Sequence, residues 1–233
     1  MNIVVLVSAN GEWKAVKSLL PQAIPEQTVF GECFDIELDG IPVTFFQGGW
    51  GKVSAAASTQ YVIDQLKPDL LVNLGTCGGF QGRIDQGIII LVEKTVIYDI
   101  IEQMIDPDEA VRLYSSTLDL SWLPRLTPTP VLRGQLVSAD RDIVREDIPM
   151  LIEKYDAVAA DWESGAIAWV AQKNRQKLLI LRGVSDLVGD DGDEVYGEYE
   201  LFTTRAKEIM RHLIEILPKW VNGIQKVQQG YRV

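Results

Sequence analysis

The sequence predicts an α/β fold in which a sheet is layered with helices. Apolar runs of strand length alternate with segments of helical periodicity along the chain. The first pair is a strand at residues 1–7 and a helix at 12–20, separated by a short polar loop. The chain has 233 residues, of which 47% are hydrophobic, and this suits one core. We therefore expect a single domain spanning residues 1–233.

The remaining elements follow from the same two periodicities. We expect strands at residues 30–38, 41–47, 70–74, 87–98, 132–138, 157–160 and 177–181, and helices at residues 52–66, 147–155, 164–172 and 201–217. Asp39-Gly40 is a turn pair that closes a β-hairpin between two of these strands. Residues 106–130 are polar and contain four prolines, so we expect an irregular surface excursion there.

Charge and cysteine content exclude several classes of protein. The net charge of -11 argues against nucleic acid and against an anionic membrane surface as partners. No apolar run is long enough to span a bilayer, and residues 1–7 are too short for a signal peptide. Cys33 and Cys77 form no metal-ligand pattern, and we expect no disulfide between them. We expect a cytoplasmic location.

Several local motifs permit two interpretations. The glycine segment 75–79 follows a strand but lacks the spacing of a dinucleotide-binding loop. Its glycines either bring backbone amides close to a ligand or form a tight turn. Cys77 is a nucleophile or, since no histidine lies near it in sequence, a small buried thiol. The acidic stretch 190–194 is a cation-binding loop or a solvated one, and His212 is a structural or surface residue of the last helix.

Three acidic residues carry the strongest signal. Glu163 follows the strand at 157–160, and Asp186 follows the strand at 177–181. In open α/β sheets ligands bind at the carboxyl ends of the strands, so both carboxylates are placed for chemistry or for holding polar groups. Glu12 follows the first strand and is either a first-turn helix acid or a third member of this group. We expect all three to share one edge of the sheet.

The segments around these acids resemble those of the nucleoside phosphorylase and nucleosidase superfamily, and most closely those of the 5'-methylthioadenosine/S-adenosylhomocysteine nucleosidases. They occur in the family's order and cover most of the chain outside roughly 99–130. The matching segments are residues 49–56, 67–69, 73–79, 137–140, 161–168 and 182–186.

The resemblance implies a three-layer α/β/α sandwich around a central mixed sheet, and cleavage of the bond between a purine base and ribose. It implies that Asp186 protonates the base, that Glu163 binds the ribose hydroxyls, and that Glu12 orients the attacking water. Further residues that it places at the substrate are Trp162, Thr76, Gly78, Ile143, Ser185 and Tyr196. A proton donor on one side and an activated water on the other is the logic of an inverting glycosidase, which requires no metal or organic cofactor.

Hydrolysis is favoured over phosphorolysis by two residues. Phosphorylases of the superfamily hold phosphate with an arginine where this chain has Asn73, and the Glu12 carboxylate would repel phosphate. A phosphorylase, a futalosine-type nucleoside hydrolase and an inactive nucleoside-binding relative remain alternatives. Two departures bear on the substrate: Trp162 replaces a methionine that packs on the ribose, and Asp142 replaces an aromatic residue beside the base. The resemblance also implies a homodimer, in which the partner subunit closes the pocket for the 5' group.

Overall fold

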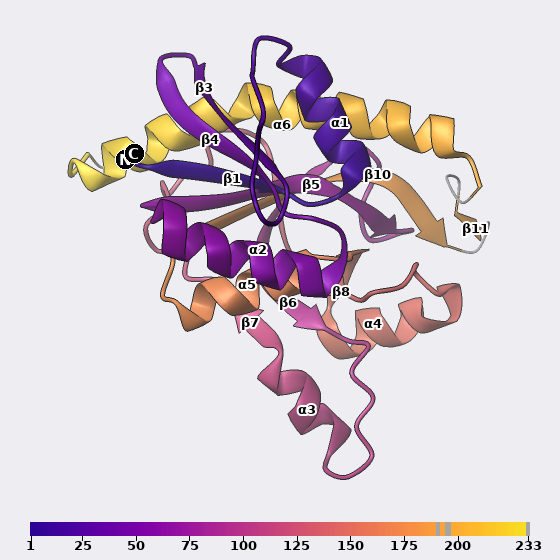
Figure 1. Ribbon diagram of the computed structural model, residues 1–233. Helices are drawn as coiled ribbons and strands as arrows, with labels where there is room; N and C mark the ends of the chain where they lie inside the picture. Colours follow the sequence, from indigo (N-terminus) through magenta and orange to yellow (C-terminus); the bar gives the residue numbers. More distant parts are fainter. Residues whose placement is uncertain (190–191, 194–196, 232–233) are drawn as a thin grey trace.

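The computed structural model describes residues 1–189, 192–193 and 197–231, and Figure 1 shows a mixed sheet between two layers of helices. The strands are β1 (Ile3–Val7), β2 (Glu26–Gln27), β3 (Glu32–Leu38), β4 (Ile41–Gln47), β5 (Leu70–Phe80), β6 (Ile89–Ile97), β7 (Ser115–Thr117), β8 (Leu132–Ser138), β9 (Ala157–Asp161), β10 (Leu178–Gly189) and β11 (Gly192–Asp193). The helices are α1 (Asn10–Leu19), α2 (Gly51–Leu66), α3 (Pro107–Leu113), the 3-10 helix η1 (Arg145–Asp147), α4 (Ile148–Tyr155), α5 (Ser164–Lys173) and α6 (Tyr199–Gln228).

The alternating side chains of β1 explain the layers. Val5 and Val7 face one hydrophobic cluster, which α1 and α6 cover. Val4 and Leu6 face a second cluster, which α2 and α5 cover. Because β1 is buried on both faces, its sequence is a continuous apolar run. The predicted three-layer α/β/α sandwich with a mixed sheet is confirmed.

Strand β5 lies at the centre of the sheet and positions the site. On one side it pairs with β10 along most of its length. On its other side it pairs first with β1, at residues 70–73, and then with β9, at residues 78–79. Within the described part of the sheet, residues 74–77 pair with neither β1 nor β9. The sheet therefore opens beside the middle of β5, and side chains from several elements converge on this opening.

We expected the strand to end at residue 74, before the glycine segment 75–79. The segment is instead part of β5. None of its glycines has a positive φ. Their lack of a side chain is needed for space, since a Cβ on Gly78 would lie 2.7 Å from Ile143 Cδ1 and one on Gly79 2.7 Å from Val184 Cγ1. Close packing, rather than a turn, explains these glycines.

Two further expectations about the sheet were wrong. β10 extends to Gly189, so Ser185 and Asp186 lie inside the strand, where a register shift after Val184 marks a bulge. β9 runs antiparallel to β5, so Glu163 does not come from the carboxyl end of a parallel neighbour. It reaches the same region because β9 ends at the opening beside β5.

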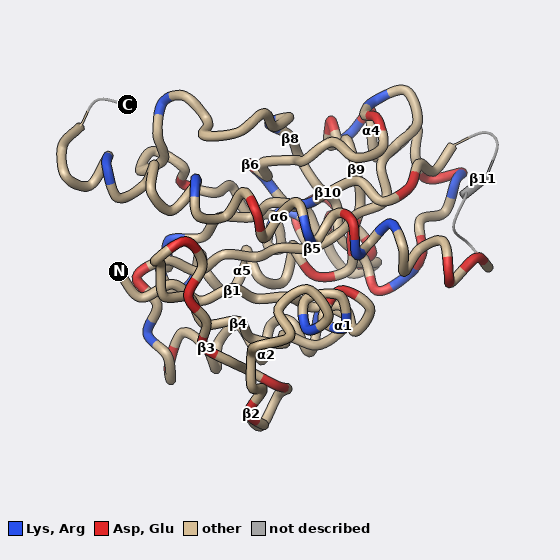
Figure 2. Tube along the Cα trace, turned by 90° about the horizontal axis from the view of Figure 1, so that it is seen from above, with Lys and Arg blue, Asp and Glu red and all other residues tan. Residues whose placement is uncertain are grey.

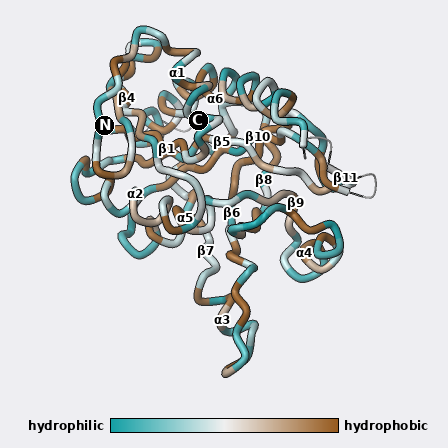
Figure 3. The backbone as a smooth tube through the Cα atoms, turned by 45° about the vertical axis from the view of Figure 1, so that its right-hand side comes forward, coloured by the Kyte–Doolittle hydropathy of each residue, from teal (hydrophilic) through white to brown (hydrophobic). Residues whose placement is uncertain are grey.

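The excursion after β6 has two parts. Residues 99–114, which include α3, form an arm that projects from the sheet (Figure 1). It mixes polar and apolar residues (Figure 3), and Ile101 and Met104 are 87% and 91% exposed. Residues 118–131 instead pack along α6, where Trp220 Nε1 donates to Thr129 Oγ1 at 3.0 Å. This packing stabilises α6 beyond Pro218, so that the helix ends at Gln228 rather than at residue 217, where we expected its end.

The cysteines, the basic residues and the helices have the following properties. Both cysteines are free thiols, and Cys77 is buried. Figure 2 shows the basic residues dispersed along the trace rather than gathered on one face. Among the described residues, no helix is both long enough and apolar enough to cross a membrane.

Candidate active site

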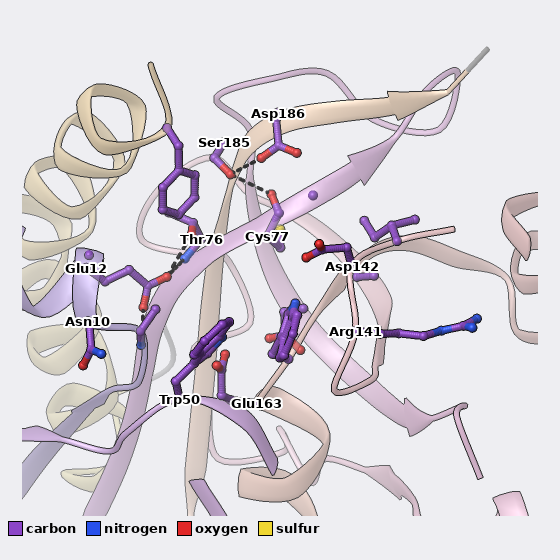
Figure 4. A pocket seen from close by; sticks show the side chains of 18 of the residues that line it. Asn10, Glu12, Trp50, Thr76, Cys77, Arg141, Asp142, Glu163, Ser185 and Asp186 are labelled. Carbon is purple, nitrogen blue, oxygen red and sulfur yellow. Dashed lines mark hydrogen bonds between the residues drawn. The ribbon is translucent and has the colours of Figure 1, made fainter. Parts of the chain in front are cut away.

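A cavity of about 500 Å³ lies at the opening beside β5. Its walls come from the start of α1, the start of α2, the middle of β5, the loop after β8, the end of β9, the bulge of β10 and the start of α6. Glu12, Glu163 and Asp186 all line it, and Figure 4 shows them approaching from three different elements. The structure therefore brings the three acids together, although the topology that unites them differs from the expected one.

Glu12 is fixed by hydrogen bonds at the start of α1. Its Oε1 accepts from the Thr76 backbone N at 2.5 Å and from Thr76 Oγ1 at 2.8 Å. Its Oε2 accepts from the Ala9 backbone N at 3.3 Å, as an acid in the first turn of a helix commonly does. Burial raises the pKa of Glu12, against the opposing effects of Arg182 and of the Thr76 amide. A carboxylate with a raised pKa is a stronger general base.

Glu163 occupies the residue just before α5. Its Oε1 accepts from the Gly51 backbone N at 3.2 Å, so the start of α2 holds it in place. Burial raises the pKa of Glu163 to about 8, and the carboxylates of Asp161 and Glu12 add to this rise while Arg182 opposes it. The Glu163 carboxyl group therefore gains or loses its proton near pH 8.

Arg182 lies beneath both glutamates and is completely buried. Its guanidinium donates to Ser164 Oγ and Asn73 Oδ1, each at 2.9 Å, and to the Thr76 carbonyl at 3.3 Å. Its Nε forms an ion pair of 3.0 Å with Asp161 Oδ2. A Cβ on Gly75 would lie 2.0 Å from Arg182 Nη1, so only glycine leaves room for this side chain.

Asp186 and its neighbours form the opposite end of the cavity. Ser185 Oγ donates to Asp186 Oδ1, and both residues are nearly inaccessible to solvent. A Cβ on Gly78 would be 3.4 Å from Asp186 Oδ2, which places the carboxylate directly over the β5 backbone. Thr76, Gly78, Ile143 and Ser185 all line the cavity, as the resemblance implied. Tyr196 lies outside the described residues, as do Asp190, Asp191 and Glu194 of the acidic stretch.

Aromatic side chains cover the outer part of the cavity. The rings of Trp50 and Trp162 lie 4.8 Å apart between centroids, and Trp50 is 59% exposed. Tyr199 and Phe202 line the side formed by α6. Flat apolar walls of this kind suit a ring or an apolar substituent.

Asp142 and Arg141 differ in how they face the cavity. Figure 4 shows the Asp142 carboxylate turned toward the cavity and the Arg141 side chain directed away from it. Arg141 forms an ion pair with Asp147 and lies 5.5 Å from the centre of the Tyr98 ring. The exposed Asp142 is therefore the charged group of this loop that faces the cavity.

The other candidate residues have structural explanations. Burial raises the pKa of the Cys77 thiol well above its usual range, which makes the thiol a poor nucleophile. His212 is exposed on α6 and does not line the cavity. Among the described residues, no three His, Cys, Asp or Glu side chains are arranged to hold a metal ion.

Comparison with known proteins identifies the family. The model of the phosphorylase superfamily matches residues 2–217. The chain belongs to the phosphorylase superfamily. A 5'-methylthioadenosine/S-adenosylhomocysteine nucleosidase from Maridesulfovibrio salexigens is 28% identical over 185 residues, which are 74% of this chain and 80% of that protein.

Two solved structures of superfamily members share the fold of this chain. The apo 5'-methylthioadenosine nucleosidase of Arabidopsis thaliana has a TM-score of 0.74 and 24% identity, and the alignment covers 96% of each chain. A mutant Helicobacter pylori nucleosidase with 5'-methylthioadenosine in the active site has a TM-score of 0.76 and 16% identity, with 95% and 98% of the two chains covered.

Sequence reasoning gave no role to Arg182, Asp161 or Trp50. A signal for Arg182 was present, because a charged residue directly follows the apolar run 178–181 of a buried strand. A buried arginine requires carboxylate partners, and Asp161 and Glu163 stand in the acidic segment already singled out. Trp50 lies between two glycines of a loop and had no comparable signal.

Proposed function

We propose that this chain hydrolyses the N-glycosidic bond of a purine nucleoside such as 5'-methylthioadenosine or S-adenosylhomocysteine, and releases the free base and the ribosyl product. The observation that carries the proposal is the convergence of Glu12, Glu163 and Asp186 on one cavity. The names of the relatives support it, since the similar proteins are nucleosidases. In this role the enzyme would belong to nucleoside metabolism and methionine salvage.

The placement of the three acids supports distinct roles. Asp186, at the end formed by β10, protonates the leaving base. Glu163, held by the Gly51 amide, accepts hydrogen bonds from the ribose hydroxyls. Glu12, locked by Thr76, takes a proton from water that attacks the opposite face of the sugar. A developing oxocarbenium ion lies among these groups, and those of their oxygens that are ionised stabilise it.

The surroundings of Glu12 favour water over phosphate as the nucleophile. Asn73 is buried and accepts a hydrogen bond from Arg182, so it offers no cation to the cavity. Arg182 itself lies beneath the cavity in an ion pair with Asp161. A phosphate ion beside Glu12 would meet carboxylates on several sides, which disfavours its binding. The phosphorylase alternative is therefore the weaker one, and the intact Ser185–Asp186 pair speaks against an inactive relative.

We also propose a homodimer that acts in the cytoplasm. The arm formed by residues 99–114 exposes Ile101 and Met104, and such a surface is suited to contact with a second subunit. Two free thiols suit a reducing compartment. Sedimentation of the wild-type protein and of Met104→Asp tests the dimer: the substitution should shift the protein toward monomer, and a wild-type monomer would contradict the proposal.

The proposed activity is tested with a panel of nucleosides in phosphate-free buffer, with mass spectrometry of the released base. The panel contains 5'-methylthioadenosine, S-adenosylhomocysteine, adenosine, inosine and futalosine, which differ in the base and in the 5' group. We expect free base and free ribosyl sugar from at least one adenine nucleoside, with a rate that added phosphate leaves unchanged. Strict dependence on phosphate would establish the phosphorylase, and binding without turnover would establish the inactive relative.

A further inference from the structure

Arg182 is positioned asymmetrically among three carboxylates. Its Nε forms an ion pair of 3.0 Å with Asp161, whereas its nearest distances to Glu12 and Glu163 are 3.8 Å and 3.9 Å. Its hydrogen bonds run to Ser164, Asn73 and Thr76, and none of these acceptors is a cavity carboxylate. The guanidinium thus lies close to one acid and at nearly equal, longer distances from the other two.

Asp161 is built into the protein by several further bonds. Its Oδ1 accepts from Ser138 Oγ at 2.6 Å, and both of its oxygens lie 3.2 Å from the Ser164 backbone N. Ser164 Oγ also donates to Asp161 Oδ2. The hydrogen bonds from Ser138 and Ser164 and the ion pair with Arg182 therefore engage both carboxylate oxygens of Asp161. Asp161 lines the cavity, but these bonds to the protein make its carboxylate a rigid anchor.

We propose that Asp161 is a positioning residue, which holds the Arg182 guanidinium in an ion pair with itself and out of direct contact with the two cavity glutamates. Without this anchor a buried guanidinium would form a two-point pair with Glu12 or Glu163. Such a pair would occupy the oxygens that, under the proposed function, water and ribose need. The inference rests on the proposed function for the roles of the two glutamates.

The charges around Arg182 make the consequence measurable. Titratable groups from several elements surround the guanidinium or its neighbours. They are Glu12 from α1, Cys77 from β5, Asp161 at the end of β9, Glu163 just before α5, and Asp186 from β10. Arg182 faces three close carboxylates in a dry interior, so full ionisation of all three is costly. The negative charge of Asp161 therefore helps to keep a proton on Glu163, and its loss should release that proton at lower pH.

Asp161→Asn tests this with little change of shape. The amide oxygen can face Arg182 and the amide nitrogen can face Ser138 Oγ, so the charge is lost while the packing is retained. We expect the apparent pKa in the pH profile of kcat/KM to fall by about one unit or more. Asp161→Glu keeps the charge and should restore the profile toward that of the wild type. Asp39→Asn, in the exposed hairpin turn, is the matched control and should leave the profile unchanged.

A merely structural role gives a different result. It predicts a lower Tm and an equal loss of kcat/KM at every pH, with no shift of the profile, and that outcome would overturn the proposal. If Asp161→Asn does not fold, Asp161→Ser provides a second neutral variant with the same expected shift. A profile that stays at the wild-type position in the folded neutral variant contradicts the role of Asp161.

Titration of the carboxyl groups by carbon-13 NMR separates this inference from the proposed function. In the wild type one carboxyl signal should titrate near pH 8, and Glu163→Gln should remove it. The same signal should titrate at lower pH in the neutral variant. If no nucleoside is cleaved but this shift is observed, the proposed function fails and the role of Asp161 stands. Equal titration in both proteins refutes the role of Asp161, whatever the activity.

Discussion

The cavity has two regions that are built differently. The floor, which consists of Glu12, Asp161, Glu163, Arg182 and Asp186, is buried and joined by hydrogen bonds and ion pairs. The rim, which consists of Trp50, Arg141, Asp142 and Tyr199, is exposed. Each floor residue is held by backbone amides, hydroxyls or a neighbouring charge, whereas the rim is held mainly by ring stacking and by one ion pair.

This difference separates chemistry from substrate choice. Proton transfer and charge stabilisation require groups fixed in a dry, preorganised environment, and the floor provides that environment. The exposed side chains of the rim point to a role in the choice of substrate. The two departures from the nucleosidase pattern, Trp162 and Asp142, lie toward the rim, in keeping with a retained reaction and an altered substrate.

The largest effect is expected at the floor residue that meets the base. Asp186→Asn removes the acidic proton but keeps the shape of the side chain and the hydrogen bond from Ser185. We expect kcat to fall by about 10²- to 10⁴-fold, with ligand affinity largely retained, because the lost proton acts only during bond cleavage. Stopped assays of base release, paired with calorimetric binding, measure both quantities. Turnover at the wild-type rate would refute the assignment of Asp186 as the acid.

The second prediction contrasts the packing of the two regions. Gly75→Ala places a Cβ 2.0 Å from Arg182 Nη1 and 2.8 Å from Glu12 Oε1, so both side chains must move. We expect a loss of roughly 10²-fold in kcat/KM and about 2 to 4 kcal/mol in the free energy of unfolding. Asp142→Ala, the matched change in the rim, should alter the free energy of unfolding by less than about 0.5 kcal/mol. Urea denaturation of both variants decides whether the floor is as tightly packed as its geometry indicates.

The third prediction concerns the pH dependence of stability. Glu163 has its usual pKa near 4.5 when unfolded and a pKa of about 8 when folded, so between these values the folded state binds more protons. The free energy of unfolding therefore falls as pH rises through this window. We expect Glu163→Gln to remove about 2 to 4 kcal/mol of that fall between pH 5 and 8.5. Asp142→Asn in the rim should leave the slope unchanged, and an equal slope in Glu163→Gln would show that Glu163 is not the titrating group.

The contrast also explains what could be predicted from the sequence. The alternation of strands and helices could be predicted because strands such as β1 are buried on both faces and therefore form apolar runs. Most element boundaries follow from this alternation. Glu12, Glu163 and Asp186 could be found because each follows or ends an apolar run. The direction of β9 and the opening beside β5 could not be found, since strand pairing depends on contacts far apart in the chain.

Other errors have the same origin in tertiary contacts. The strand that begins at residue 70 was expected to end at 74, before Gly75, Gly78 and Gly79. Packing against Arg182, Ile143 and Val184 instead requires glycine within β5. The last helix was expected to end near residue 217, but the buried Trp220, with its hydrogen bond to Thr129, holds α6 together beyond Pro218. Local preference gave way to packing in both cases.

The smallest effect is expected at the rim. Trp50→Ala removes a ring that is 59% exposed and that, within the described part of the chain, stacks on Trp162 alone, so we expect its loss to leave the floor intact. We expect KM to rise about 3- to 10-fold, which corresponds to roughly 1 kcal/mol of lost ring contact, with kcat nearly unchanged. The rise should be larger for a nucleoside with an apolar 5' substituent than for one with a 5' hydroxyl, if Trp50 contacts that group. An equal loss of kcat would instead show that Trp50 helps to hold Glu163 through the neighbouring Gly51 amide, and the division between floor and rim would no longer apply at this residue.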